Sequence, residues 1–236
     1  MNSPTESSKI ITWGGYLALT LLLALPLSIL YVRSGMWQQG LVIYALCCVG
    51  ATLLLAVFAL CMALPRFATQ RRPLMIRSLA SLPGTALFLS LLTGGDYPAI
   101  HDITTDTLDP PLFTQAQNIR GKSANSLDIN AQTLQLQVDG YPDIKAHHST
   151  RNFADAFARA TDVAKMMGWE ISYSDAEAGI IEAVDTTAVM AFKDDIVIRL
   201  RRAENGTRID LRSVSRVGVS DMGANAKRIR AFLSRL

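Results

Sequence analysis

The chain has 236 residues, half of them hydrophobic, and a formal net charge of +3. The basic excess comes from residues 1–95, which hold six Lys/Arg and one acidic residue, whereas residues 96–236 hold 17 Lys/Arg and 19 Asp/Glu. A domain with a negative balance lacks the electrostatic footprint of a nucleic-acid-binding protein, so no nucleic-acid partner is expected. All three cysteines precede residue 62, so residues 96–236 contain neither a disulfide nor a thiol nucleophile.

Three apolar stretches predict a membrane domain over residues 1–95. Residues 10–32 and 41–64 carry no charge, and at about 1.5 Å per residue each is long enough to cross a hydrocarbon core of about 30 Å. The third stretch, residues 74–94, is weaker, because its apolar run is shorter and Arg77 lies within it. We expect three transmembrane helices; the alternative is a re-entrant or interfacial third segment.

The basic residues predict the orientation of these spans. The link between the first two carries only Arg33, whereas the link between the second and third carries Arg66, Arg71, Arg72 and Arg77. The positive-inside rule places the second link in the cytoplasm. The N-terminus is then cytoplasmic, and the C-terminal domain lies on the opposite side of the membrane. In a bacterium this describes a multi-pass inner-membrane protein with a periplasmic domain and membrane lipids as partners.

Residues 96–236 predict an α+β domain. Apolar residues recur at helical spacing over residues 152–167, and Gly168 follows where a helix-terminating glycine is expected. A second amphipathic helix is expected over residues 223–235. Between the helices, four runs of alternating apolar and polar residues predict strands over 169–173, 180–185, 196–201 and 208–212. Short connections favour antiparallel neighbours, so we expect about four antiparallel strands covered by two helices.

The alternation within these strands predicts one buried face. In the last strand Ile209 and Leu211 should point inward, with Arg208, Asp210 and Arg212 outward.

Two other segments carry weaker signals. Residues 96–144 predict irregular structure apart from a short helix over 131–138, because Asp109-Pro110-Pro111 interrupts any regular element. Residues 189–192 either extend the second strand or form a short strand of their own.

Three separated motifs stand out in the domain: IHDITTDTLDPP at residues 100–111, YPDI at 141–144 and SVSRVGVSDMGANAKRIRAFL at 213–233. Together, and in this order, they resemble the bacterial domain of unknown function 1499 family. The resemblance covers residues 96–236, and the preceding membrane segments resemble those of some members. It implies a bacterial envelope protein and assigns no activity and no catalytic residue. The helix–sheet–helix order is also similar to helix-grip domains of envelope lipoproteins, at the level of fold alone.

His101, Asp102 and Asp106 form one candidate site, just after the third span. Imidazole and carboxylate are ligands that Zn²⁺ or Mn²⁺ requires, so the alternative function is a metal-dependent hydrolase of the envelope. Against this hypothesis, short polar residues often satisfy backbone groups in a structured loop, and no accompanying ligand pair has metal-site spacing. We therefore expect no cofactor and assign no catalytic residue.

Arg216, Ser220, Asp221, Asn225 and Arg228 form a second cluster, around a strand end and the start of the last helix. A helix N-terminus attracts anions and an arginine adds bidentate hydrogen bonds, so these residues are the candidate binding site. A structural connection is the more common role for such a boundary, so we also expect that Asp221 caps the helix and pairs with Arg216. The preferred function is a non-enzymatic envelope binding or scaffolding protein, with an envelope protein or an anionic polymer as its partner.

Overall fold

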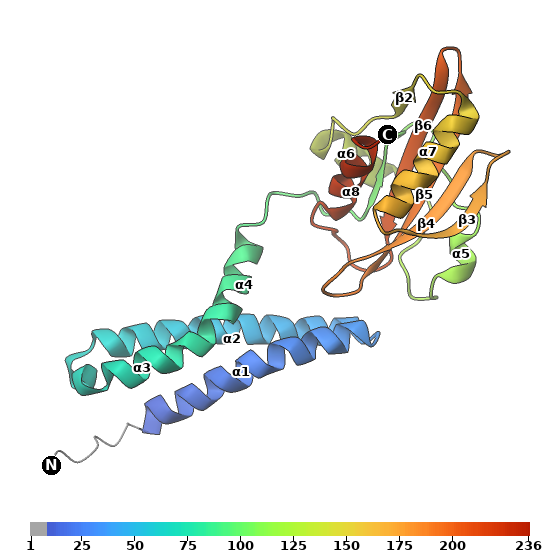
Figure 1. Ribbon diagram of the computed structural model, residues 1–236. Helices are drawn as coiled ribbons and strands as arrows, with labels where there is room; N and C mark the ends of the chain where they lie inside the picture. Colours follow the sequence, from blue (N-terminus) through green and yellow to red (C-terminus); the bar gives the residue numbers. More distant parts are fainter. Residues whose placement is uncertain (1–8) are drawn as a thin grey trace. The chain divides into compact units, whose positions relative to one another are not determined.

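The computed structural model describes residues 9–236, which the contacts divide into two compact units between Gly94 and Gly95. The predicted cytoplasmic N-terminus, residues 1–8, lies outside the described residues. The N-terminal unit contains helices, and the C-terminal unit contains an antiparallel sheet with helices (Figure 1).

The N-terminal unit contains three helical stretches that are long and apolar enough to cross a membrane. Two are the single helices α1, Lys9–Arg33, and α2, Trp37–Ala63. The third, Pro65–Leu92, is built from four elements: η1 Pro65–Gln70, α3 Arg71–Ser78, η2 Leu79–Ser81 and α4 Leu82–Leu92. These candidate spans indicate a membrane protein. The third begins before residue 74 and is bent, since α4 turns away from α3 (Figure 1), with Pro83 in its first turn.

Small residues allow close approach within this unit. A Cβ atom added to Gly84 of α4 would lie 2.7 Å from the Cβ of Ala51 in α2, so these two helices pack through small side chains. Arg77 is likewise engaged inside the unit. Its stem fills the space beside Gly15 of α1, and its Nη1 donates to Thr12 Oγ1 at 3.4 Å.

The sheet of the C-terminal unit has six antiparallel strands: β1 Asp102–Thr104, β2 His147–Ser149, β3 Glu170–Asp175, β4 Ile180–Thr186, β5 Lys193–Ala203 and β6 Gly206–Ser215. The spatial order is β1-β6-β5-β4-β3, and β2 also pairs with β6. The predicted number of about four strands was too low. The two additional strands have three residues each, too few for a periodic signal, and pairing with the edge of β6 creates them.

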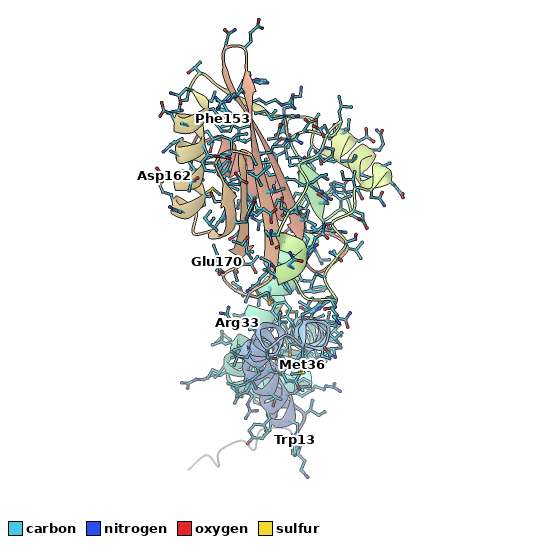
Figure 2. The ribbon with its side chains drawn as sticks, turned by 90° about the vertical axis from the view of Figure 1, so that its right-hand side faces the viewer. Trp13, Arg33, Met36, Phe153, Asp162 and Glu170 are labelled. Carbon is cyan, nitrogen blue, oxygen red and sulfur yellow. The ribbon has the colours of Figure 1, made fainter. Side chains whose placement is uncertain are left out.

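Two helices cover one face of this sheet (Figure 1). Helix α7, Phe153–Met166, begins at Asn152, whose side chain accepts from Asp155 N–H at 2.9 Å. The helix ends at Met166, and Gly168, with φ of +79°, follows it before β3 begins at Glu170 (Figure 2). The expected glycine-terminated helix end is therefore present. Helix α8, Ala224–Leu233, is the second cover.

The remaining segments differ partly from expectation. Helix α6, Ala131–Gly140, confirms the short helix expected over residues 131–138, whereas helix α5, Ala116–Ile119, lies in the segment predicted to be irregular. Residues 187–192 form neither an extension of β4 nor a strand. They close a tight loop in which Thr187 N–H donates to Phe192 O at 2.8 Å, with Ala191 at a φ of +55°.

Both faces of the sheet are buried, which corrects the expectation of a single buried face. Ile209 and Leu211 join the apolar core beneath α7 and α8. On the other face Asp210 and Arg212 are 0% and 1% exposed. Part of the segment between β1 and α6 covers that face, where Phe113 and Ala116 pack with Val197 and Val214. The outward charges are therefore buried beneath chain that sequence periodicity predicted only as irregular structure.

Candidate functional site

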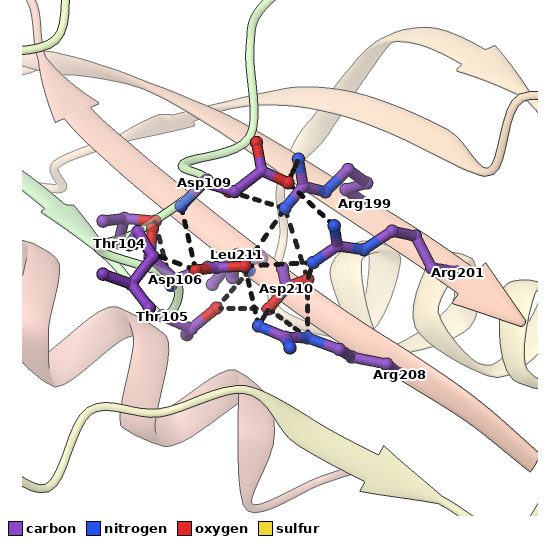
Figure 3. A network of polar contacts seen from close by, with 10 residues as sticks. Thr104, Thr105, Asp106, Asp109, Arg199, Arg201, Arg208, Asp210 and Leu211 are labelled. Carbon is purple, nitrogen blue, oxygen red and sulfur yellow. Dashed lines mark hydrogen bonds and ion pairs between the residues drawn. The ribbon is translucent and has the colours of Figure 1, made fainter. Parts of the chain in front are cut away.

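A network of three arginines and three aspartates occupies the second face of the sheet (Figure 3). Arg199 and Arg201 alternate along β5, and the register places them opposite Asp210 and Arg208 of β6. Arg201 Nη2 lies 2.8 Å from Asp210 Oδ2, and Arg208 Nη2 lies 2.7 Å from Asp106 Oδ2. Each carboxylate thus accepts from several guanidinium groups, which is what makes burial of these charges tolerable.

Asp106 also organises the loop that follows β1. Its Oδ1 accepts from the backbone N–H groups of Leu108 and Asp109 at 3.2 and 3.1 Å. Burial alone would raise the pKa of Asp106, but the Asp109 N–H and the guanidinium groups of Arg201 and Arg208 hold it below its ordinary value. The carboxylate is therefore ionised, and it fixes the loop while leaving the Leu108 side chain exposed.

A second buried cluster centres on Arg212. This side chain stacks over Phe113, holds Asp102 with two hydrogen bonds and donates to the carbonyl oxygen of Leu127 at 2.9 Å. Arg212 of β6 therefore joins β1 and the covering segment to the sheet.

Glu182 was not singled out from the sequence. It is 1% exposed within β4, and its carboxylate accepts from the backbone N–H groups of Thr114, Gln115 and Ala116 at the start of α5. A charged residue between Ile181 and Ala183, on the strand face opposite the apolar core, was the only signal in the sequence.

The three metal-candidate residues are engaged separately. Asp102 pairs with Arg212, Asp106 with the arginine network, and the Nδ1 of His101 lies 3.3 Å from Val219 O. Among residues 9–236 no group of three or more His, Cys, Asp or Glu side chains is placed to hold a metal ion.

The predicted binding residues divide between the two faces of the sheet. Arg216 lies on the network face, where it pairs with Asp195 at 2.7 Å. Asn225 and Arg228 are buried from the α8 side. Arg228 Nε donates to Asp185 at 2.7 Å, and its Nη2 also pairs with Asp194.

Asp221 and Ser220 satisfy backbone groups at the start of α8. Asp221 accepts from Gly223 N–H at 2.8 Å and from Asn225 N–H at 2.9 Å. The N-cap position itself is held by Gly223, so Asp221 satisfies N–H groups at the start of α8 from two residues before that position. Ser220 Oγ accepts from Met222 N–H at 3.2 Å. The expected pair between Arg216 and Asp221 is wrong, because the arginine points to the opposite face. As a ligand site the five residues remain a prediction.

One shallow cavity, of about 370 Å³, lies beside α6. It is lined by Thr105, Gln137, Tyr141 and Lys145, among others. Burial, reinforced by the nearby charge of Asp221, raises the pKa of Tyr141, whose ring lies under Arg230. The phenol is therefore neutral at ordinary pH and acts here as a packing residue.

The architecture defines a class of protein: a helical unit with three candidate membrane spans, followed by an α+β domain with a charged network on one face of its sheet. Residues 102–236 match the model of a family described as Protein of unknown function (DUF1499). The chain belongs to this family, which confirms the resemblance of its three motifs. No curated protein and no solved structure matches the chain.

Proposed function

We propose that this protein is a non-enzymatic binding or scaffolding protein of the bacterial envelope, anchored in the inner membrane by its N-terminal unit. The domain would hold an envelope protein or an anionic envelope polymer near the membrane. The observation that carries this proposal is the loop after β1. Leu108 is 97% exposed and Leu112 is 64% exposed, although the loop between them is fixed.

The fixing contacts come from the charged network. Asp106 accepts the Leu108 and Asp109 N–H groups, and Arg199 Nη2 donates to Asp109 O at 2.7 Å. Two apolar side chains held outward on an ordered loop form a preorganised contact surface, which lowers the entropic cost of binding. The buried charges support this surface.

Binding by the full-length protein in mild detergent tests the proposal. Immobilised protein is probed with peptidoglycan fragments and with purified envelope proteins. We expect one of these to bind, and the Leu108→Asp/Leu112→Asp variant to weaken binding at least about tenfold, since each buried leucine contributes about 1.5–3 kcal/mol. Ile129→Asp, at another exposed apolar position, is the matched control. Failure of both classes of probe to bind contradicts the proposal.

The rival function is a metal-dependent hydrolase using His101, Asp102 and Asp106. Elemental analysis of tag-free protein separates the two hypotheses, because the rival requires about one bound metal ion per chain. Stoichiometric metal, together with substrate turnover that depends on His101, would favour the hydrolase. The arginine partners of both aspartates support the non-enzymatic proposal.

A further inference from the structure

The strand register sorts the loops of the C-terminal unit between the two ends of its sheet. β5 and β6 pair from Asp194 opposite Ser215 at one end to Ala203 opposite Gly206 at the other. The chain enters through β1, which pairs with the last residues of β6, so we call the first end the entry end. The β5–β6 turn lies at the far end, about 35 Å away, because β5 has 11 residues at about 3.3 Å each.

The two ends differ in the side chains that they expose. Large apolar residues are exposed on segments at the entry end: Tyr97, Met166, Val189, Val219 and Met222. The turns at the far end, residues 176–179 and 204–205, contain only Ala, Glu, Gly and Asn. Figure 2 shows this axis, with Phe153 near the end of the β5–β6 hairpin and Glu170 near the entry end.

The loop between β6 and α8, residues 216–223, turns its polar groups inward. Asp221 N–H donates to Ile100 O at 3.0 Å, and the Asp221 carboxylate accepts from Gly223 N–H. Gly218 O accepts from Asn125 Nδ2 at 2.8 Å. These bonds fix the loop from the inside and leave its apolar side chains on the outside.

Val219 and Met222 are those outward side chains, 76% and 53% exposed. Met222 also adopts a φ of +52°, a left-handed conformation that is unfavourable for a residue with a side chain. The strained backbone holds a side chain that is half exposed. Exposed apolar side chains on a fixed loop are typical of a surface that contacts an apolar partner or a lipid.

The chain limits how far this end lies from the third candidate span, whatever the arrangement of the two units. Helix α4 ends at Leu92, and Tyr97 already packs against the loop, where a Cβ on Gly223 would lie 2.6 Å from its ring. Five residue steps span at most about 18 Å. Tyr97 therefore lies within that distance of the end of the span, and the loop that contains Gly223 lies beside Tyr97.

We infer that the entry end is a lipid-contacting surface, with Val219 and Met222 inserted at the membrane boundary and Tyr97 at the headgroup level. Tyrosine favours this boundary because its ring is amphipathic. The inference rests on the proposed membrane anchoring and identifies the occupant of this surface as lipid, because the short connection from Leu92 to Tyr97 keeps the surface beside the bilayer.

Cross-linking from lipid to the native full-length chain tests the inference. The protein is reconstituted into phosphatidylcholine–phosphatidylglycerol vesicles that contain a lipid with a photoreactive group in its upper acyl chain. Trypsin releases the entry-end peptide 217–227 and the far-end peptide 203–208. We expect lipid adducts on peptide 217–227 to exceed those on peptide 203–208 at least about tenfold, given their separation of about 35 Å. Equal labelling of both peptides, or labelling of neither, overturns the inference.

A variant pair separates this surface from the one in the proposed function. Val219→Asp/Met222→Asp should lower the adducts on peptide 217–227 at least about fivefold, because charge opposes insertion. Leu108→Asp/Leu112→Asp should leave them unchanged. If the Leu108/Leu112 variant loses ligand binding but keeps its lipid adducts, the proposed function and the lipid-contacting surface are both supported. If adducts persist undiminished in the Val219/Met222 variant, the lipid surface is wrong, whatever the ligand assays show.

Discussion

Asp102 and Arg212 form a two-bond pair, with Arg212 Nε to Asp102 Oδ1 at 3.0 Å and Arg212 Nη2 to Asp102 Oδ2 at 2.7 Å. The pair fastens β1 to β6, and Arg212 is 1% exposed. The carboxylate that the sequence offers as a metal ligand is thus one half of a structural clamp.

Breaking this clamp should destabilise the protein strongly. Removing one partner of a buried pair leaves an uncompensated charge and costs about 3–5 kcal/mol. Asp102→Ala should therefore lower the melting temperature of the full-length protein in detergent by roughly 10 °C or more. Arg212→Lys should also lower the melting temperature strongly, because lysine keeps the charge but lacks the planar two-donor geometry. The exposed Arg230–Asp143 pair is the control, since Arg230→Ala should cost less than about 1 kcal/mol. Equal effects for the two pairs would contradict the clamp.

Arg216 should couple energetically to Asp195 and not to Asp221. The Arg216 and Asp195 side chains share three hydrogen bonds, whereas the Asp221 carboxylate accepts from the Asn225 N–H of α8. In double-mutant cycles by urea denaturation, Arg216→Ala with Asp195→Ala should deviate from additivity by about 0.5–3 kcal/mol. Arg216→Ala with Asp221→Ala should add within about 0.5 kcal/mol. Non-additivity for Arg216 with Asp221, and additivity for Arg216 with Asp195, would instead support a direct Arg216–Asp221 pair.

The lowered pKa of Asp106 predicts a pH-dependent contribution to stability. The folded state holds this proton less readily than the unfolded state, because the arginine network and backbone N–H groups favour the carboxylate. The contribution is therefore present above the unfolded pKa of about 4 and is lost as the pH falls through the lower folded pKa. The melting-temperature gap between wild type and Asp106→Asn should narrow between about pH 5 and pH 2. A difference in melting temperature that does not change with pH would show that the charge of Asp106 does not contribute to stability. Asp139→Asn, at an exposed position of α6, is the control.

Two glycines with similar backbone angles should differ in their tolerance of alanine. Gly168 and Gly179 have φ of +79° and +70°, but only Gly179 is crowded, since an added Cβ would lie 2.4 Å from Leu200 O. Gly168→Ala should cost about 1 kcal/mol from backbone strain. Gly179→Ala should cost more, because the β3–β4 turn must also move. Chemical denaturation measures both, and equal costs would argue against the close approach to β5.

Reporter fusions test the orientation. A fusion at Arg72 and a fusion at the C-terminus should report opposite sides of the membrane, the first cytoplasmic and the second periplasmic, because the basic residues cluster between the second span and the uncharged part of the third. The same compartment for both fusions would mean that the bent third segment does not cross.

Local signals in the sequence predicted much of the fold. The helical stripe over residues 152–167, with Gly168 after it, gave α7 within a residue, and the alternating runs gave β3 to β6. Such periodicity records which side chains a single element buries, so it is visible without knowledge of the neighbours. The two short strands β1 and β2 were missed, because their three residues become strands only through pairing with β6.

The sequence by itself determined three candidate spans, the family, and the positions of the charged residues. Only the tertiary structure decided what those charges do. In the folded domain Arg212 is buried beneath residues far away in the sequence, and Asp106 pairs with three arginines. Arg216 pairs with Asp195 and not with Asp221. The physical reason is that a charge is stabilised by whichever partner the fold brings within a few ångströms, and here those partners lie about 20 to 110 positions away along the chain.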